Sequence, residues 1–266
     1  MFVVERVHPD GAKVTDEIIG IGQTGIVIKQ GEHAVKIPRL TRILEIDGVP
    51  VQSGRMTPEE GSGSVDERPI FIQTLQKEKA IYRRLSNHSG IIQCLNLSSD
   101  HYSIQMPLMQ SDLKNYLRKN LPDKQRKLSW LKEMASTLSY IHSRCVIIGD
   151  YRLDNIMLDD QMNTKLIDFS ESTLMPLDWD LQGADEWGFS VLTDIGQFGV
   201  AMLEMITGQH CEFDTLRDWD TVGATWPGRD TLPSTNGVWL GHIIEKCWTR
   251  GYTSAAELAE DLSKEG

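Results

Sequence analysis

Two short apolar segments in the middle of the chain, each leading into an aspartate, constrain the fold more than any other feature. Residues 145–150 read CVIIGD, residues 163–169 read NTKLIDF, and the polar loop YRLDN follows the first of them. Apolar runs this short are consistent with buried strands. Asp150 and Asp168 therefore stand where strands give way to loops, either as turn acids of a hairpin or as reactive groups.

The rest of the chain divides into a strand-rich first part and a helical second part. The first 37 residues alternate β-branched residues with glycine-rich turns, and Gln30-Gly31 fits a hairpin tip. From Ile70 apolar residues recur at helical spacing, and a short strand pair is expected at 91–98 and 101–109. Further helices are expected at 111–121, 128–143, 194–208, 237–248 and 254–264. These elements predict an α+β fold.

A polar stretch interrupts the first part. Residues 47–69 are rich in Gly, Ser, Pro and charged residues and have no apolar period. Such a composition is typical of an exposed connection. We expect a mobile insertion there, with outer limits at about 41–69.

A glycine-rich pattern lies in the predicted hairpin before residue 30. Residues 20–27 read GIGQTGIV, which matches G-x-G-x-x-G-x-V. Glycines there allow a backbone to approach phosphate oxygens without a Cβ collision, and the N–H groups can meet the anion. A tight hairpin without any ligand is the other interpretation, because the pattern alone is weak.

A lysine follows the glycine-rich pattern inside an apolar strand. Lys36 stands 11 residues after Gly25, in the sequence AVKI. A buried lysine needs a polar partner, and Glu78, on the predicted helix after residue 70, can provide one. Alternatively, Lys36 extends its charged head into water from an edge strand.

The loop after Asp150 carries the remaining polar groups that phosphoryl transfer requires. Such transfer uses a carboxylate and an amide oxygen on Mg²⁺, a carboxylate near the acceptor hydroxyl and a cation for developing charge. Asn155 and Asp168, the latter 18 residues after Asp150, fit as metal ligands. Asp150 fits as the base that orients the hydroxyl, and Arg152 fits as the cation.

These motifs, in this order, resemble those of the eukaryotic protein-kinase family over nearly the whole chain. The segment from Asp194 to Gly208, DIGQFGVAMLEMITG, is similar to the D-x-W-S-x-G…E…T-G helix of that family. The resemblance implies a bilobal fold with a small β-rich N-lobe containing one helix and a larger α-helical C-lobe. We expect one kinase domain over 1–266, with lobes 1–107 and 108–266. The wording GDYRLDNIMLD…KLIDFSES also looks like that of small fungal kinase-like proteins.

The resemblance also implies roles for individual residues. Lys36 would contact the α- and β-phosphates of ATP, Glu78 would pair with it, and Asp194 would brace the catalytic loop. Residues 106–109 would form the hinge beside adenine. The expected nucleotide contacts are Gly20, Ile21, Gly22, Gln23, Thr24, Gly25, Val27, Ala34, Lys36, Met106, Leu108, Met109 and Met157.

Three departures from the family pattern stand near the expected site. Ile148-Gly149 replaces His-Arg before Asp150, which predicts activity independent of activation-loop phosphorylation. Ser170 replaces the glycine of D-F-G, which predicts a stiffer segment. The A-P-E motif is absent and only 25 acidic-rich residues separate Asp168 from Asp194, which makes a peptide-docking platform less certain than ATP chemistry.

Composition limits the partners and the compartment. Lys plus Arg number 27 against 38 Asp plus Glu, a net charge of −11, which argues against nucleic acid or anionic membranes. The four cysteines form no C-x-x-C pair, as is usual for thiols in a reducing compartment. A signal peptide and an apolar run of about 18 residues are both missing. We expect a monomer in the cytoplasm or nucleus.

Three functions fit the sequence. The first is a protein Ser/Thr kinase that uses ATP and Mg²⁺ to phosphorylate a hydroxyl group. The second is a pseudokinase or ATP-binding scaffold, since the catalytic loop has lost two family residues. The third is a small-molecule kinase similar to the aminoglycoside and choline phosphotransferases, whose loops also read G-D…N and I-D-F.

Overall fold

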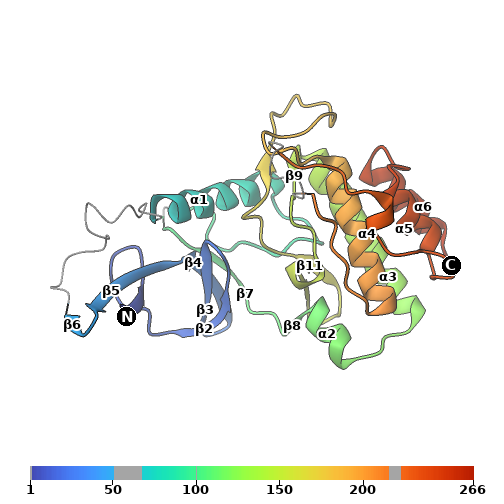
Figure 1. Cartoon of the computed structure of the whole chain (residues 1–266). Helices are drawn as coiled ribbons and strands as arrows, with labels where there is room; N and C mark the ends of the chain where they lie inside the picture. Colours follow the sequence, from blue (N-terminus) through green and yellow to red (C-terminus); the bar gives the residue numbers. More distant parts are fainter. Residues whose placement is uncertain (1, 51–67, 100, 216–222) are drawn as a thin grey trace. The chain divides into compact units, whose positions relative to one another are not determined.

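The chain divides into two compact units, one rich in strands and one rich in helices (Figure 1). The computed structural model describes residues 2–50, 68–99, 101–215 and 223–266. The first unit comprises Met1–Arg83 and Gln93–Leu108, and the second comprises Arg84–Ile92 and Met109–Gly266. The α+β class with a strand-rich N-terminal part and a helical C-terminal part is confirmed. The assignment of all 266 residues to one domain stays a prediction.

The main sheet of the N-terminal unit is antiparallel and carries the apolar core of that unit. Its strand order is β2 (Glu17–Ile21), β3 (Gly25–Gln30), β4 (His33–Pro38) and β7 (Ile104–Pro107). The buried side chains on β3 and β4 that form the core are Ile26, Ile28, Val35 and Ile37. β3 and β4 therefore lie inside the sheet, with β2 at one edge and β7 at the other.

A second sheet corrects the expected limits of the insertion. β1 (Phe2–Val7) pairs antiparallel with β5 (Leu40–Ile46), and β5 pairs with β6 (Val49–Pro50). The segment expected as an insertion from about residue 41 therefore begins with strand β5, where pairing with β1 satisfies the backbone of residues 41–46. Residues 51–67 of the insertion lie outside the described residues.

The connection between the helix of the first unit and β7 also differs from the prediction. The helix, α1, spans Arg68–Leu85. Residues 92–99 form no strand and include a turn at 95–98, and the Asn96 side chain donates to Ser103 O and accepts from Gln105 N–H. A side chain that satisfies the backbone locally competes with strand pairing, so only the second strand of the expected pair forms.

The C-terminal unit is built from helices with three small strand pairings. Its helices are α2 (Leu113–Lys119), α3 (Lys124–Ser143), α4 (Val191–Thr207), α5 (Gly241–Trp248) and α6 (Ala255–Lys264). Short strands hold the loops between α3 and α4: β10 (Ile156–Leu158) pairs with β8 (Ser111–Asp112) and β11 (Thr164–Leu166), and β9 (Val146–Ile147) pairs with β12 (Thr173–Leu174). Within the described ranges, every helix is too short or too polar to cross a membrane.

α4 is the central buried helix of this unit and lies beside α3 (Figure 1). A capping box formed by Ser190 and Thr193 starts it, and Gly208, at φ 75°, ends it as the sequence predicts. A Cβ on Gly196 would lie 2.2 Å from the Phe213 ring, and one on Gly199 would lie 2.8 Å from Trp248 Nε1. These two glycines let large rings pack directly on the α4 backbone and so fix its position.

Replacing Ser190 with Ala should lower the free energy of unfolding by about 1 kcal/mol, because the Oγ that accepts from the Thr193 N–H is lost. Urea denaturation followed by circular dichroism measures this. Ser190→Asp, which keeps an acceptor at the same position, should remain close to the wild type. Equal stability of all three proteins would contradict the role given to the cap.

Candidate functional site

A buried ion pair joins the predicted lysine and glutamate in the N-terminal unit. Lys36 Nζ on β4 lies 2.8 Å from Glu78 Oε2 on α1. The two residues are 7% and 1% exposed. An edge-strand lysine with its head in water is therefore excluded. Burying two charges is costly even when they pair, so a pair in this place is weak evidence of a stability role.

The glycine-rich hairpin approaches the same lysine. A Cβ on Gly25 would lie 3.1 Å from Lys36 Cε and 3.3 Å from Ile37 O, so this glycine leaves room for the lysine side chain. The turn closes with a hydrogen bond from Gly22 N–H to Gly25 O. Arg39 holds the same turn, because its guanidinium donates to Gly22 O and its N–H donates to Thr24 O.

The segment expected beside adenine is only partly available to a nucleotide. Met106 is buried in β7, opposite Ala34 on β4. The Leu108 N–H donates to Glu32 O at 2.9 Å. A nucleotide could use this N–H only if that hydrogen bond were broken. Met157, another expected contact, lies half-buried in β10 of the other unit.

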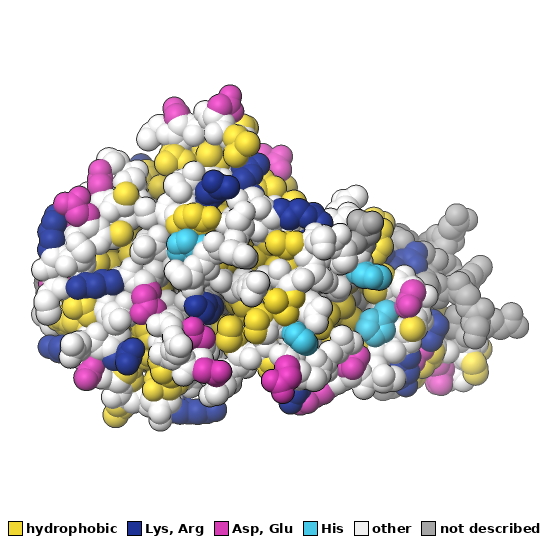
Figure 2. Space-filling model, turned by 180° about the vertical axis from the view of Figure 1, so that it is seen from behind, with side chains coloured by type: hydrophobic (Ala, Val, Ile, Leu, Met, Phe, Trp, Pro, Cys, Tyr) yellow, Lys and Arg dark blue, Asp and Glu magenta, His cyan; other side chains and the backbone are white. Residues whose placement is uncertain are grey.

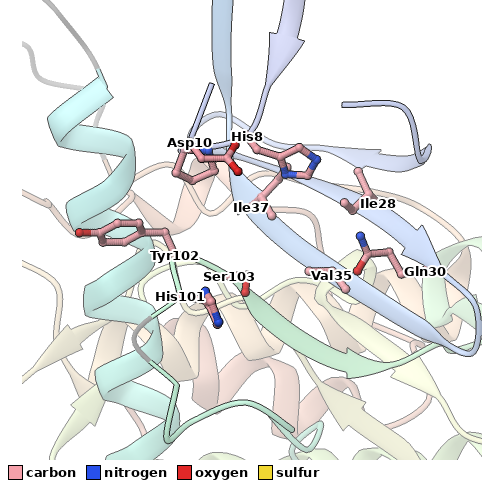
Figure 3. Close-up of a pocket in the computed structure, with 10 residues that line it drawn as sticks. His8, Asp10, Ile28, Gln30, Val35, Ile37, His101, Tyr102 and Ser103 are labelled. Atoms are coloured by element: carbon pink, nitrogen blue, oxygen red, sulfur yellow. The ribbon is translucent and has the colours of Figure 1, made fainter. Parts of the chain in front are cut away.

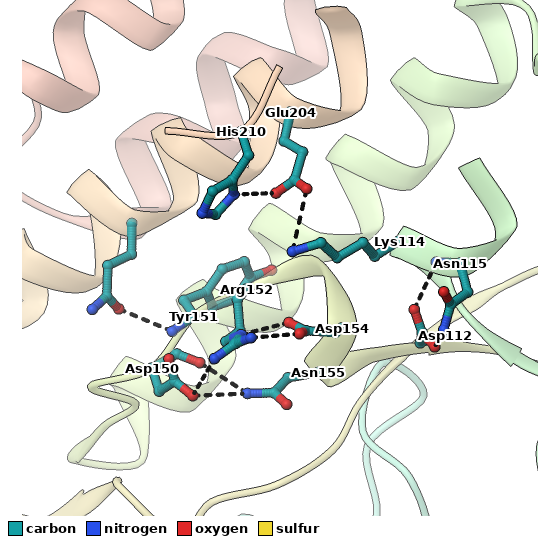
Figure 4. Close-up of polar contacts among 11 residues, drawn as sticks. Asp112, Lys114, Asn115, Asp150, Tyr151, Arg152, Asp154, Asn155, Glu204 and His210 are labelled. Atoms are coloured by element: carbon teal, nitrogen blue, oxygen red, sulfur yellow. Dashed lines mark hydrogen bonds and ion pairs between the residues drawn. The ribbon is translucent and has the colours of Figure 1, made fainter. Parts of the chain in front are cut away.

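The expected catalytic loop, residues 150–155 of the C-terminal unit, brings Asp150, Asn155 and Arg152 together (Figure 4). Asn155 Nδ2 donates to Asp150 O at 3.1 Å and lies 3.3 Å from Asp150 Oδ2. Burial raises the pKa of the Asp150 carboxyl, and the nearby charge of Arg152 partly opposes that rise.

The guanidinium of Arg152 pairs with the neighbouring carboxylate of Asp154. Its Nε and Nη2 atoms both lie 2.5 Å from the carboxylate oxygens of Asp154, whereas its Nη1 lies 3.9 Å from Asp150 Oδ2. A bidentate pair of this kind holds the guanidinium plane in one orientation. The predicted cation is thus beside Asp150 but is oriented by Asp154.

The segment that starts with Asp168 has a special backbone conformation at the aspartate. Asp168 has a φ of 61°, in the left-handed region that Asp tolerates better than most residues. Ser170 is not among the residues with positive φ. Serine in place of the family glycine therefore carries no backbone strain in this conformation. Ser172 is fully buried and donates from its Oγ to Ile148 O.

Asp194 on α4 anchors the start of the catalytic loop. Its buried carboxylate accepts from the N–H groups of Ile148 and Gly149, both at 2.8 Å, and lies 2.9 Å from His142 Nε2. The bracing expected for Asp194 is present in this geometry. The sequence reading missed His142, Ser172 and Gln197, which also hold this loop. Gln197 could have been noticed as a departure from the serine of the D-x-W-S-x-G pattern.

The donors near the loop suit magnesium in part. The amide nitrogen of Asn155 faces Asp150, which directs the amide oxygen elsewhere (Figure 4). Oxygen ligands such as this amide and the Asp168 carboxylate are those that Mg²⁺ prefers, together with phosphate oxygens. Among the described residues no three His, Cys, Asp or Glu side chains gather as a metal cluster. A magnesium ion held by only two protein side chains and by phosphates needs no such cluster.

Each unit has a cavity of its own. One of about 430 Å³ lies beside the catalytic loop and is lined by Asp150, Arg152, Gln197, Cys211 and Phe213, among others. Burial raises the pKa of the Cys211 thiol to about 11, so it stays protonated near neutral pH. The other cavity, of about 460 Å³, faces His8, His101 and the apolar side chains of Val35 and Ile37 (Figure 3). Because successive side chains of a strand alternate, that cavity is on the face of β4 opposite Lys36.

Charges of both signs are interspersed over the face shown in Figure 2. Lys and Arg side chains do not gather into one continuous stripe on that face, and Asp and Glu side chains occur between them. That face therefore shows no continuous basic patch of the kind that binds a polyanion.

Comparisons with known proteins point to one family. A model of the protein kinase domain matches residues 59–183, which include Glu78, the catalytic loop and Asp168 but neither the glycine-rich hairpin nor Lys36. The serine/threonine/tyrosine-protein kinase HT1 of Arabidopsis thaliana is 24% identical over 69% of this chain and 52% of its own length.

Other relatives match over shorter stretches. Protein kinase C zeta type of Oryctolagus cuniculus is 26% identical over 55% of this chain and 28% of its own length. A probable serine/threonine-protein kinase of Dictyostelium discoideum is 26% identical over 44% of this chain and 10% of its own length. The chain thus spans about half or less of the length of these relatives.

Replacing Asp194 with Asn should lower the free energy of unfolding by about 2–4 kcal/mol, because an amide N–H₂ would face donors that now meet a carboxylate. Asp178→Asn changes an exposed aspartate in the same unit and should cost less than about 0.5 kcal/mol. Thermal and urea unfolding of both variants measure the difference. A stability of Asp194→Asn within error of Asp178→Asn would show that the anchor is not required.

Proposed function

We propose that the chain, which is similar to the protein kinase domain over residues 59–183, is a member of the protein-kinase family and transfers the γ-phosphoryl group of ATP to a hydroxyl group, with Mg²⁺ as cofactor. Serine and threonine side chains are the proposed acceptors. The relatives with serine/threonine-kinase names support this acceptor class.

The observation that carries the proposal is the contact between Asp150 and Asn155. A carboxylate that orients an acceptor hydroxyl and an amide that serves a metal must be held a few ångströms apart. Here Asn155 Nδ2 bonds to both the backbone and the carboxylate of Asp150. Asp194 fixes the backbone before them. A chain that only bound nucleotide would have no need of a carboxylate at position 150.

The remaining groups take the following roles in the proposal. Lys36, oriented by Glu78, binds phosphate oxygens of the nucleotide. Asn155 and Asp168 hold magnesium. Bound ATP would supply the phosphoryl group, and its Mg²⁺ would offset the negative charge of the phosphate oxygens. Asp150 orients the acceptor hydroxyl and takes its proton as the new O–P bond forms and the bond to ADP breaks. The cavity of about 430 Å³ beside Asp150 would receive the acceptor.

An ATP-binding scaffold is the second candidate, and two observations favour it. The guanidinium of Arg152 is held by Asp154, which limits its use at a transferring phosphoryl group. The Leu108 N–H is engaged with Glu32 O, which removes one backbone donor expected beside adenine. Both features would slow a kinase without preventing nucleotide binding.

Transfer of radiolabel from [γ-³²P]ATP decides between these functions. The wild type with Mg²⁺ should label itself or a mixture of peptides, proteins and small hydroxyl compounds. Asp150→Asn and Lys36→Met should each lower labelling at least about 100-fold. Lys29→Met, at an exposed position of β3, serves as the matched control and should label as the wild type does.

The proposal would be contradicted if the wild type transferred no radiolabel to any acceptor but still bound Mg·ATP in a thermal-shift assay. That result would favour the scaffold. Label on a small hydroxyl compound alone, with none on protein, would instead favour a small-molecule kinase.

The pH dependence of kcat/KM should report Asp150. The carboxylate must be ionised to accept a proton, so the rate falls as pH falls through its pKa, which burial places above the usual range. The charge of Arg152 lowers that pKa. Arg152→Met should therefore shift the acid limb to higher pH, whereas Arg118→Met, at an exposed position of α2, should leave it in place. An acid limb that stays fixed or moves down in Arg152→Met would assign it to another group.

A further inference from the structure

The residue before Asp150 is a glycine, whose backbone can adopt conformations that other residues rarely take. Gly149 precedes it with a φ of 78°, a conformation that costs glycine little and other residues more. A Cβ at Gly149 would lie 2.9 Å from Glu171 O, so only glycine fits there. A glycine beside the proposed base leaves the direction of its carboxylate dependent on contacts from elsewhere in the unit.

One side chain from α4 supplies such contacts on both sides of Asp150. Gln197 Nε2 donates to Gly149 O at 2.7 Å, and Gln197 Oε1 accepts from the Tyr151 N–H at 2.9 Å. A carbonyl can only accept and an N–H can only donate, so the two bonds fix which end of the amide is which. The amide of Gln197 therefore bridges the two residues that flank Asp150.

The helix that carries Gln197 is itself firmly placed. Its neighbour Gly196 contacts the Phe213 ring, and Gly196 O accepts from Trp248 Nε1 at 3.2 Å. Asp194 and Gln197 are three residues apart and so share one face of α4. Asp194 binds the N–H groups of Ile148 and Gly149, and Gln197 continues the same contact line to Tyr151.

We propose that Gln197 is a positioning residue, which acts through the loop backbone to set the direction of the Asp150 carboxylate. This inference rests on the proposed function. The loop is flexible at Gly149, where the family pattern has arginine. The two hydrogen bonds of Gln197 restrain the backbone there. The Tyr151 ring adds to the fixation, since it is 4% exposed and packs 5.3 Å from the Phe198 ring. A small displacement of a reacting group is enough to slow a reaction about 10- to 100-fold.

The test compares Gln197→Met with Gln209→Met. Methionine keeps the length of the side chain and removes both hydrogen bonds, and Gln209 is exposed just beyond the end of α4. Gln197→Met should lower kcat about 10- to 100-fold with the KM for ATP within about twofold of the wild type. Hydrogen exchange of the Tyr151 amide should become faster. Gln209→Met should match the wild type in all three measurements.

A second variant, Gln197→Glu, gives a signature that loss of packing would not. The ionised carboxylate accepts from Tyr151 but repels Gly149 O, whereas the protonated carboxyl can donate to that oxygen as the amide does. The kcat of the variant, divided by that of the wild type at the same pH, should therefore rise as pH is lowered from about 7 to about 4.5, the range in which a glutamate carboxyl begins to take up its proton. This ratio also decides the matter if Gln197→Met fails to fold.

Each result has a defined meaning. Unchanged kcat in Gln197→Met, or a pH-independent ratio for Gln197→Glu, would overturn the proposal. If the wild type transfers no phosphoryl group, the proposed function fails. Exchange at the Tyr151 amide then still tests the bridge made by the Gln197 amide, and equal exchange rates in wild type and Gln197→Met would overturn that bridge too.

Discussion

The position of the expected catalytic loop depends on the hydrogen bonds that the buried carboxylate of Asp194 accepts. A charge in the interior is tolerated only when donors surround it, and here two backbone N–H groups and the His142 ring do so. Those donors come from α3 and from the loop before Asp150. The need to satisfy one carboxylate therefore fixes α3, α4 and the loop together, and the rings packed on Gly196 and Gly199 keep α4 from adjusting.

A similar principle explains the N-terminal unit. Lys36 and Glu78 are both buried, and an apolar pair of similar size would serve stability as well or better. Their retention inside the sheet and helix is understandable if a ligand anion completes the environment of the lysine. Gly25 supports this reading, because the absence of its Cβ is what leaves space beside the lysine chain. Each unit thus uses a buried charge to orient a side chain with a role in the proposed chemistry.

The sequence predicted the chemical groups better than the contacts that hold them. Lys36, Glu78, Asp150, Asn155, Asp168 and Asp194 could be found because their spacing follows a family order. The strand at 40–46 was missed because its stability comes from β1, about 40 residues away, and the strand at 91–98 fails because Asn96 satisfies the local backbone. Gln197 and Ser172 act through single hydrogen bonds to distant backbone atoms, which leave no period or motif in a sequence.

The most direct measurement is a crystal structure of the protein with Mg²⁺ and a non-hydrolysable ATP analogue. The account predicts a metal ion coordinated by the Asn155 amide oxygen, the Asp168 carboxylate and phosphate oxygens. It also predicts phosphate oxygens within hydrogen-bond distance of Lys36 Nζ. A nucleotide that touches neither Lys36 nor a metal on Asn155 and Asp168 would contradict the account.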